Sequence, residues 1–124
     1  MLQHIALTIN NPEEIENFYE GVLLFNNKNK YSLSEENSLN IFNLKGSTDV
    51  FFMNHQNTDF ELFVCEEKEN KLFAHVCLAY WKAEITYHNA LDRGYKTYVK
   101  QNVSHNTYFI WDKSGNMFEI KDII

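Results

Sequence analysis

The stretch LFAHVCLAY, residues 72–80, repeats the pattern of LQHIALTI, residues 2–9. In both stretches apolar side chains alternate along the chain, and a histidine stands on the opposite face, His75 in one and His4 in the other. Alternation with a period of two is typical of a β-strand that buries one face. The two halves of the chain therefore begin in the same way, which indicates an internal repeat.

Each of these strands is followed by a helix and then by three further strands. Asn11 and Pro12 favour a helix start before the apolar residues at helical spacing over 12–22. A second helix is predicted over 82–93, and Gly94 favours its end. One side of this second helix is predicted to hold Ile85, Tyr87, His88 and Leu91. The further strands are predicted over 28–33, 49–53, 60–65, 95–99, 107–111 and 117–121.

This order predicts an α+β fold of two tandem βαβββ modules, about 1–66 and 72–124, with mixed sheets and the helices on one face. We expect the modules to form a single domain, 1–124. An additional short helix is predicted over 34–46 in the first module only, and turns are predicted at 54–59 and 112–116. Element order alone also fits an unrelated α+β sandwich with accidental symmetry.

The composition fits one globular domain. The chain has 124 residues, of which 44% are hydrophobic and 15% aromatic, and a formal net charge of -6. With 11 basic against 17 acidic residues and no basic block, a nucleic-acid or anionic-membrane surface is not expected. No apolar run approaches the ~20 residues of a membrane span, and no signal peptide is visible. Cys65 and Cys77 are too few for a disulfide framework, so we expect reduced thiols in a cytoplasmic protein.

Four side chains of metal-ligand type fall at matching places in the two halves. His4 and His75 lie in the first strand of each half, and Glu61 and Glu119 lie in the last strand. Glu61 follows His4 by 57 residues, whereas Glu119 follows His75 by 44. The difference of 13 equals the length of the additional helical segment, 34–46. One insertion therefore explains the mismatch.

All four side chains alternate with apolar residues, which places them on the sheet face that the helices leave uncovered. If the sheet curls, two imidazoles and two carboxylates converge on that face. Neutral imidazole and ionised carboxylate are ligands of divalent first-row metals, and such a mixed set leaves room for water. A single strand glutamate is more often only solvated. The matched set predicts a shared metal site made by His4, Glu61, His75 and Glu119.

Four stretches resemble the vicinal oxygen chelate superfamily, which includes glyoxalase I and the bleomycin-resistance proteins. They are HIALTINNPEEIENFYEGVLLF at 4–25, FELFV at 60–64, AHVCLAY at 74–80 and YFIWDKSGNMFEI at 108–120. The ending D-x-x-G-N-x-x-E-I is the most specific piece, and the resemblance covers essentially the whole chain. One departure is Leu24, where the family often has glycine. The resemblance implies that both sheets wrap one cup, usually within a homodimer, and that the four residues named above are its metal ligands.

The resemblance further implies a glyoxalase-like metal-dependent enzyme of lyase or isomerase type that acts on a small organic substrate. A divalent metal (Zn, Ni, Co, Mn or Fe) chelates two neighbouring substrate oxygens and stabilises an enolate-like charge, while Glu61 or Glu119 acts as the base. Two alternatives stay open: a metal-free drug- or toxin-binding protein of the bleomycin-resistance type, and an iron-dependent dioxygenase. Cys65 and Cys77 are expected to be small buried residues rather than reactive thiols.

Overall fold

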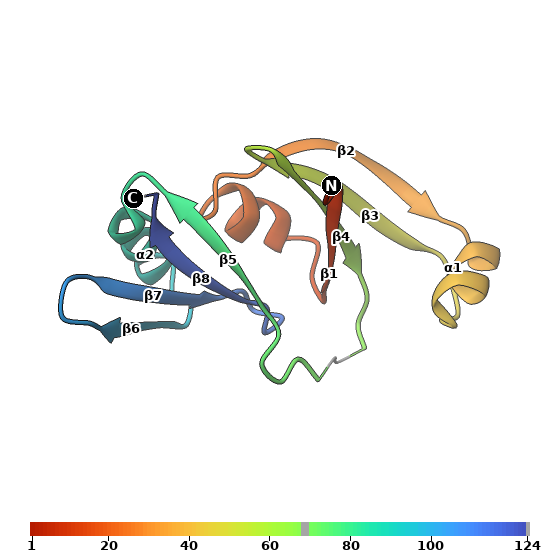
Figure 1. Ribbon diagram of the computed structural model, residues 1–124. Helices are drawn as coiled ribbons and strands as arrows, with labels where there is room; N and C mark the ends of the chain where they lie inside the picture. The colour runs from red at the N-terminus through yellow and green to blue at the C-terminus, as the bar shows by residue number, and fades with distance from the viewer. Residues whose placement is uncertain (68–69, 124) are drawn as a thin grey trace. The chain divides into compact units, whose positions relative to one another are not determined.

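The computed structural model describes residues 1–67 and 70–123 (Figure 1). The chain divides into two compact units, Met1–Lys68 and Glu69–Ile124, and each unit has its own four-stranded sheet. That the two units form a single domain stays a prediction. Among the described residues, no helix has the length and apolar character needed to cross a membrane.

The first unit has the predicted order of strand, helix and three strands, with one additional helix. Its elements are β1 (His4–Ile9), η1 (Ile15–Glu20), β2 (Asn26–Leu33), α1 (Glu35–Phe42), β3 (Thr48–His55) and β4 (Thr58–Val64). The sheet order is β1-β4-β3-β2. β1 runs parallel to β4, and the other neighbours are antiparallel.

The second unit repeats this topology. Its elements are β5 (His75–Tyr80), α2 (Ala83–Asp92), β6 (Thr97–Gln101), β7 (Asn106–Trp111) and β8 (Met117–Asp122). The sheet order is β5-β8-β7-β6, again with one parallel pair, β5 and β8. The α+β fold of two βαβββ modules is therefore confirmed. The cup, which needs both modules together, stays a prediction.

The first helix differs from the expected α-helix because it is a π-helix. Its hydrogen bonds run five residues back, from the N–H of Gly21 to the carbonyl of Glu16 and from that of Leu23 to Phe18. The helix and the turn after it bury five apolar side chains, each at most 4% exposed: Ile15, Phe18, Tyr19, Val22 and Leu23. The cap predicted at Asn11 is wrong for this helix, because its N-cap is Glu14, which makes no side-chain capping bond. The side chain of Asn11 instead accepts the Glu13 N–H at 2.9 Å, in the turn that precedes the helix.

The second helix buries a different side from the one predicted. Ala83, Thr86 and Ala90 are buried, whereas Ile85 and Leu91 are exposed. Small side chains allow a helix to approach a sheet closely, so the large apolar residues of this core come from the strands instead. These strand residues are Ile110, Phe118 and Ile120, all fully buried.

Two turns fix the strands that carry the candidate ligands. The predicted turn at 112–116 is confirmed: Oδ1 of Asp112 accepts the N–H groups of Ser114 and Asn116, and Gly115 has a φ of 87°. The predicted turn at 54–59 is wrong in length, because β3 continues to His55 and β4 begins at Thr58. Strand pairing therefore extends through residues whose polar composition suggested a loop.

The additional helix is confirmed as α1. Oγ of Ser34 accepts the Asn37 N–H at 3.1 Å, so Ser34 is the N-cap. The helix ends at Asn43, which adopts the left-handed conformation, rather than at Gly46. The ring of Phe42 lies 5.4 Å from the ring of Phe63 on β4, which places part of this helix against the first sheet.

Candidate functional site

His4 and Glu61 meet on one face of the first sheet. The prediction that helices leave this face uncovered is wrong in part, because Phe42 of α1 packs against Phe63, which shares the face of Glu61 on β4. β1 pairs with β4 so that Glu61 lies opposite Ala6, two residues beyond His4. Nε2 of His4 lies 2.8 Å from Oε2 of Glu61. The imidazole side chain is 50% exposed and the carboxylate 16%, so the pair opens to solvent on the histidine side.

His75 and Glu119 form the corresponding pair in the second unit. Nε2 of His75 lies 3.5 Å from Oε1 of Glu119. Nδ1 of His75 lies 2.9 Å from the carbonyl oxygen of Phe73. A carbonyl only accepts, so Nδ1 carries the proton in this contact and Nε2 of the neutral ring keeps its lone pair. Metal-binding histidines are commonly oriented in this way by a partner of the other ring nitrogen.

The register of the two pairs is identical. In each unit the glutamate lies opposite the residue two positions after the histidine, Ala6 for Glu61 and Cys77 for Glu119. A histidine–glutamate pair is therefore present in each unit, whereas the sequence predicted one shared site of all four residues. The matching register does not depend on the loop lengths, because it is set by the parallel strand pair alone.

The spacing of the donor atoms fits a divalent cation as well as a hydrogen bond. Two ligand atoms that bind one ion at about 2.1 Å and at a right angle lie about 3 Å apart. The observed separations are 2.8 Å for His4 and Glu61 and 3.5 Å for His75 and Glu119. Within residues 1–67 and 70–123, no group of three or more His, Cys, Asp or Glu lies together as a metal site. The site of four ligands therefore stays a prediction.

The second oxygen of each glutamate has a partner of its own. The Tyr31 hydroxyl donates to Oε1 of Glu61. Nζ of Lys121 lies 3.1 Å from Oε2 of Glu119. Burial, this hydrogen bond and the charge of Glu61 raise the pKa of Tyr31 to about 12. The hydrogen bond to Glu119 and its charge raise the pKa of Lys121.

The two cysteines occupy different surroundings. Cys65 is half-buried and Cys77 is exposed, so the expectation that both are buried is wrong for Cys77. Cys77 is exposed because it points to the uncovered face, opposite Glu119. Partial burial of the sulfur and the charge of Glu119 raise the pKa of the Cys77 thiol. A protonated thiol is a poor nucleophile and a poor metal ligand, so these surroundings do not activate the Cys77 thiol.

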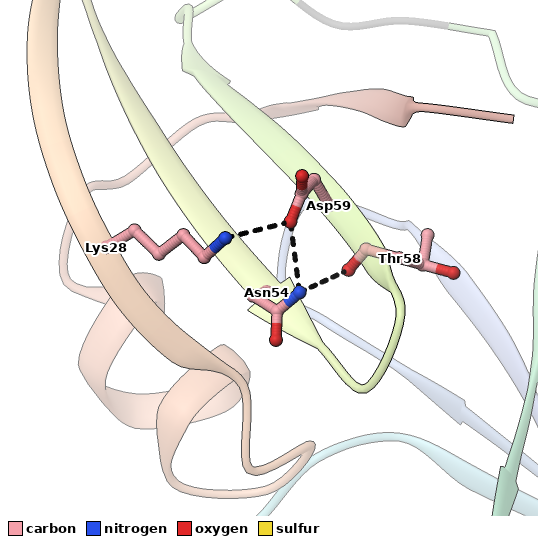
Figure 2. A network of polar contacts seen from close by, with 4 residues as sticks. All are labelled: Lys28, Asn54, Thr58 and Asp59. Atoms are coloured by element: carbon pink, nitrogen blue, oxygen red, sulfur yellow. Dashed lines mark hydrogen bonds and ion pairs between the residues drawn. The ribbon is translucent and has the colours of Figure 1, made fainter.

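Figure 2 shows a polar network of Lys28, Asn54, Thr58 and Asp59, which was not predicted from the sequence. Oδ1 of Asp59 is 3.0 Å from Nδ2 of Asn54 and 3.4 Å from Nζ of Lys28, and the Asn54 amide also donates to the carbonyl of Thr58 at 3.3 Å. The Asn54 hydrogen bond, the charge of Lys28 and the charge of His4 lower the pKa of Asp59. Asp59 lies opposite His4 in register, so a second carboxylate stands on this face.

Solved structures with similar folds come from glyoxalase and fosfomycin-resistance proteins. A glyoxalase family protein from Enterococcus faecalis is 15% identical, with a TM-score of 0.72 over 97% of this chain and 95% of that chain. The fosfomycin resistance protein FosX from Listeria monocytogenes is 13% identical, with a TM-score of 0.76 over 100% of this chain and 93% of that chain. A glyoxalase family protein from Bacillus cereus is 12% identical, with a TM-score of 0.75 over 96% and 91%.

One further Listeria FosX structure, of a variant, holds Mn(II) and 1S,2S-dihydroxypropylphosphonic acid. It is 13% identical, with a TM-score of 0.74 over 98% of this chain and 90% of that chain. No protein-family model matches the sequence, and no curated protein matches it. At these identities the likeness concerns the fold. The chain therefore has the fold of the glyoxalase and FosX proteins, which are members of the vicinal oxygen chelate superfamily.

Proposed function

We propose that this chain is a glyoxalase-like, metal-dependent enzyme of lyase or isomerase type that acts on a small organic substrate. The observation that carries the proposal is the repeated histidine–glutamate pair, which has the same register in both modules. Nothing in strand pairing alone requires a histidine and a glutamate at these two places twice. The fold neighbours, one of them with Mn(II), support the choice of a divalent metal.

His4, Glu61, His75 and Glu119 would hold the ion through two imidazole nitrogens and two carboxylate oxygens. When bound, a divalent ion supplies Lewis-acid stabilisation of negative charge on two neighbouring substrate oxygens. The His75 ring is already oriented to bind an ion through Nε2, since its other nitrogen, Nδ1, lies 2.9 Å from the Phe73 carbonyl. The identity of the metal among Zn, Ni, Co, Mn and Fe is part of the test.

The chain's own acid–base group would be one of the two glutamates. A carboxylate that takes a proton from a carbon beside a carbonyl and returns it to the neighbouring carbon performs the isomerase step. Both carboxylates are half-buried, with side chains 16% exposed for Glu61 and 18% for Glu119, so each can still be reached by a small substrate. We also propose that the substrate is a small molecule, that the chain forms a homodimer, and that the protein lies in the cytoplasm.

The first experiment is elemental analysis of the full chain purified without chelator or affinity-tag metal. About one equivalent of a transition metal is expected for a single site with four ligands. The metal should be lost in His4→Ala and in His75→Ala. The matched control is His88→Ala, because His88 is an exposed residue of α2 that pairs with Glu84 at 3.4 Å, and it should keep the metal.

The metal that is found distinguishes a lyase or isomerase from an iron-dependent dioxygenase and from a metal-free binding protein. Nickel, cobalt, zinc or manganese supports the proposal, whereas iron(II) with oxygen consumption favours the dioxygenase alternative. Wild-type protein that stays metal-free after addition of nickel, zinc, manganese and iron(II) contradicts the enzyme, and a ligand screen would then test the drug-binding alternative. Retention of the metal in His4→Ala, but not in His75→Ala, would limit the site to the second module.

A further inference from the structure

The two oxygens of Glu61 have different neighbours. Oε2 lies 2.8 Å from Nε2 of His4, whereas Oε1 accepts a hydrogen bond from the Tyr31 hydroxyl. A phenol is protonated at neutral pH, so Tyr31 is the donor and the carboxylate is the acceptor. Glu61 is therefore fixed at both ends of its carboxylate, and only the Oε2 side faces the imidazole.

The strand register explains how Tyr31 reaches Glu61 across β3. Asn29, Phe52 and Glu61 lie in one row across β2, β3 and β4. Tyr31 is two residues beyond Asn29, so it points to the same face of the sheet and is diagonal to Glu61. A tyrosine is long enough to span that diagonal.

We propose that Tyr31 is a positioning residue of the proposed metal site, which holds Oε1 of Glu61 so that Oε2, on the side of His4, is the oxygen that coordinates the ion. This inference deepens the proposed function and rests on it. A ligating carboxylate commonly has such an outer partner, and loss of the partner weakens metal binding. The hydrogen bond is to a charged acceptor, which makes it stronger than a neutral one.

The second module shows that the fold alone does not require a tyrosine at the second oxygen of the glutamate. Tyr98, Phe109 and Glu119 form the row that corresponds to Asn29, Phe52 and Glu61. The position that corresponds to Tyr31 is therefore Lys100. Oε2 of Glu119 instead lies beside Nζ of Lys121, which belongs to the same strand, β8. The tyrosine is thus a feature of one module, and its effect should be confined to Glu61.

The experiment measures Mn²⁺ and Zn²⁺ binding to the metal-free full chain by calorimetry for wild type, Tyr31→Phe and Tyr98→Phe. Tyr31→Phe should bind each metal about 10- to 100-fold more weakly, the usual cost of losing an outer partner. Tyr98→Phe removes the hydroxyl of another exposed edge-strand tyrosine and should bind as wild type. The melting temperature of each metal-free variant checks that it stays folded at the temperature of the titration, which separates positioning from folding.

A double-mutant cycle tests whether Tyr31 acts through Glu61. If it does, Tyr31→Phe causes no further loss of affinity in a Glu61→Gln background. An equal further loss there, or wild-type affinity in Tyr31→Phe alone, overturns the inference and leaves the proposed function standing. Wild-type protein that binds neither metal overturns both, so the two failures are distinguishable.

Discussion

The two modules share a register but surround their glutamates differently. Glu61 has a neutral phenol at its second oxygen, whereas Glu119 has the ammonium of Lys121 and the thiol of Cys77 beside it. The residue opposite the histidine also differs, since His4 faces Asp59 and His75 faces Met117. The same backbone pairing thus brings a histidine and a glutamate together in both modules. The side chains around each pair differ, so the two pairs have different charged neighbours.

The difference teaches that the two glutamates are not interchangeable. A positive charge beside Glu119 opposes the arrival of a divalent cation, whereas Tyr31 adds no charge beside Glu61. Equivalent positions in the two modules therefore form natural pairs of matched variants. Four predictions follow, from the largest expected effect to the smallest, and the first two compare such pairs.

The largest effect is expected from two equivalent core residues. Phe60 and Phe118 each lie in the last strand, next to the glutamate, and both are fully buried. Truncation of either to alanine should cost about 3–5 kcal/mol of unfolding free energy. If the modules form one cooperative domain, each variant shifts a single transition in thermal and chemical unfolding. Two separate transitions, with only one displaced in each variant, would contradict the single domain.

The ends of the two helical segments form the second comparison. Gly94, just after α2, has a φ of 82°. Leu24, in the turn that follows η1, has a φ of 61°. This left-handed conformation costs a non-glycine residue about 1–2 kcal/mol. Leu24 is 62% exposed, so little burial is lost on its replacement.

Leu24→Gly should therefore stabilise the protein by about 0.5–1 kcal/mol, and Gly94→Ala should destabilise it by about 1–2 kcal/mol. Chemical denaturation of both variants measures the two effects. The Cβ of Gly94→Ala would meet no atom within 4 Å, so its cost should come from the backbone alone. Destabilisation by Leu24→Gly would mean that the leucine side chain contributes packing that outweighs the strain.

The third prediction concerns pH and a histidine of the first module. Burial against the ring of Phe25, 5.2 Å away, lowers the pKa of His55. The unfolded chain therefore takes up this proton more readily than the folded one, and stability falls as the pH drops below the unfolded value of about 6.5. One proton contributes a slope of at most about 1.4 kcal/mol per pH unit.

His55→Gln should remove this part of the pH dependence of the unfolding free energy between about pH 7 and pH 5. His88→Gln, at an exposed position on α2, serves as the control and should leave the slope unchanged. An unchanged slope in His55→Gln would assign the acid sensitivity to other groups.

The smallest effect is expected at Lys121. Lys121→Met removes a cation 3.1 Å from Glu119, and its side chain is half exposed, so the gain in affinity for Mn²⁺ should be only a few-fold. Lys121→Arg keeps the charge and should bind as wild type. The gain should shrink at high salt. Weaker binding by Lys121→Met would show that the ammonium orients Glu119 rather than opposing the ion.

The sequence predicted the repeat and the matching strand positions of the four candidate ligands, because both depend on local alternation. The pairing of histidine with glutamate inside each module was not predicted, since it depends on which strands are neighbours. Tyr31 was missed, although its strand was predicted, because its neighbours depend on the order of strands in the sheet. Asp59 was missed because Asn and Asp favour turns, and here the strand pairing prevailed. Lys121 could have been noticed two residues after Glu119, on the same face of β8.

The position of β2 at the edge of its sheet has a consequence for aggregation. Its backbone groups on the outer side are a template onto which another chain could add as a strand. β2 carries Lys28 and Lys30, and its pairing with β3 is irregular between Asn27 and Asn29. Charges and bulges of this kind discourage the addition of a foreign strand. The same edge strand carries Tyr31, so resistance to fibril-like association and the proposed orientation of Glu61 depend on one short segment.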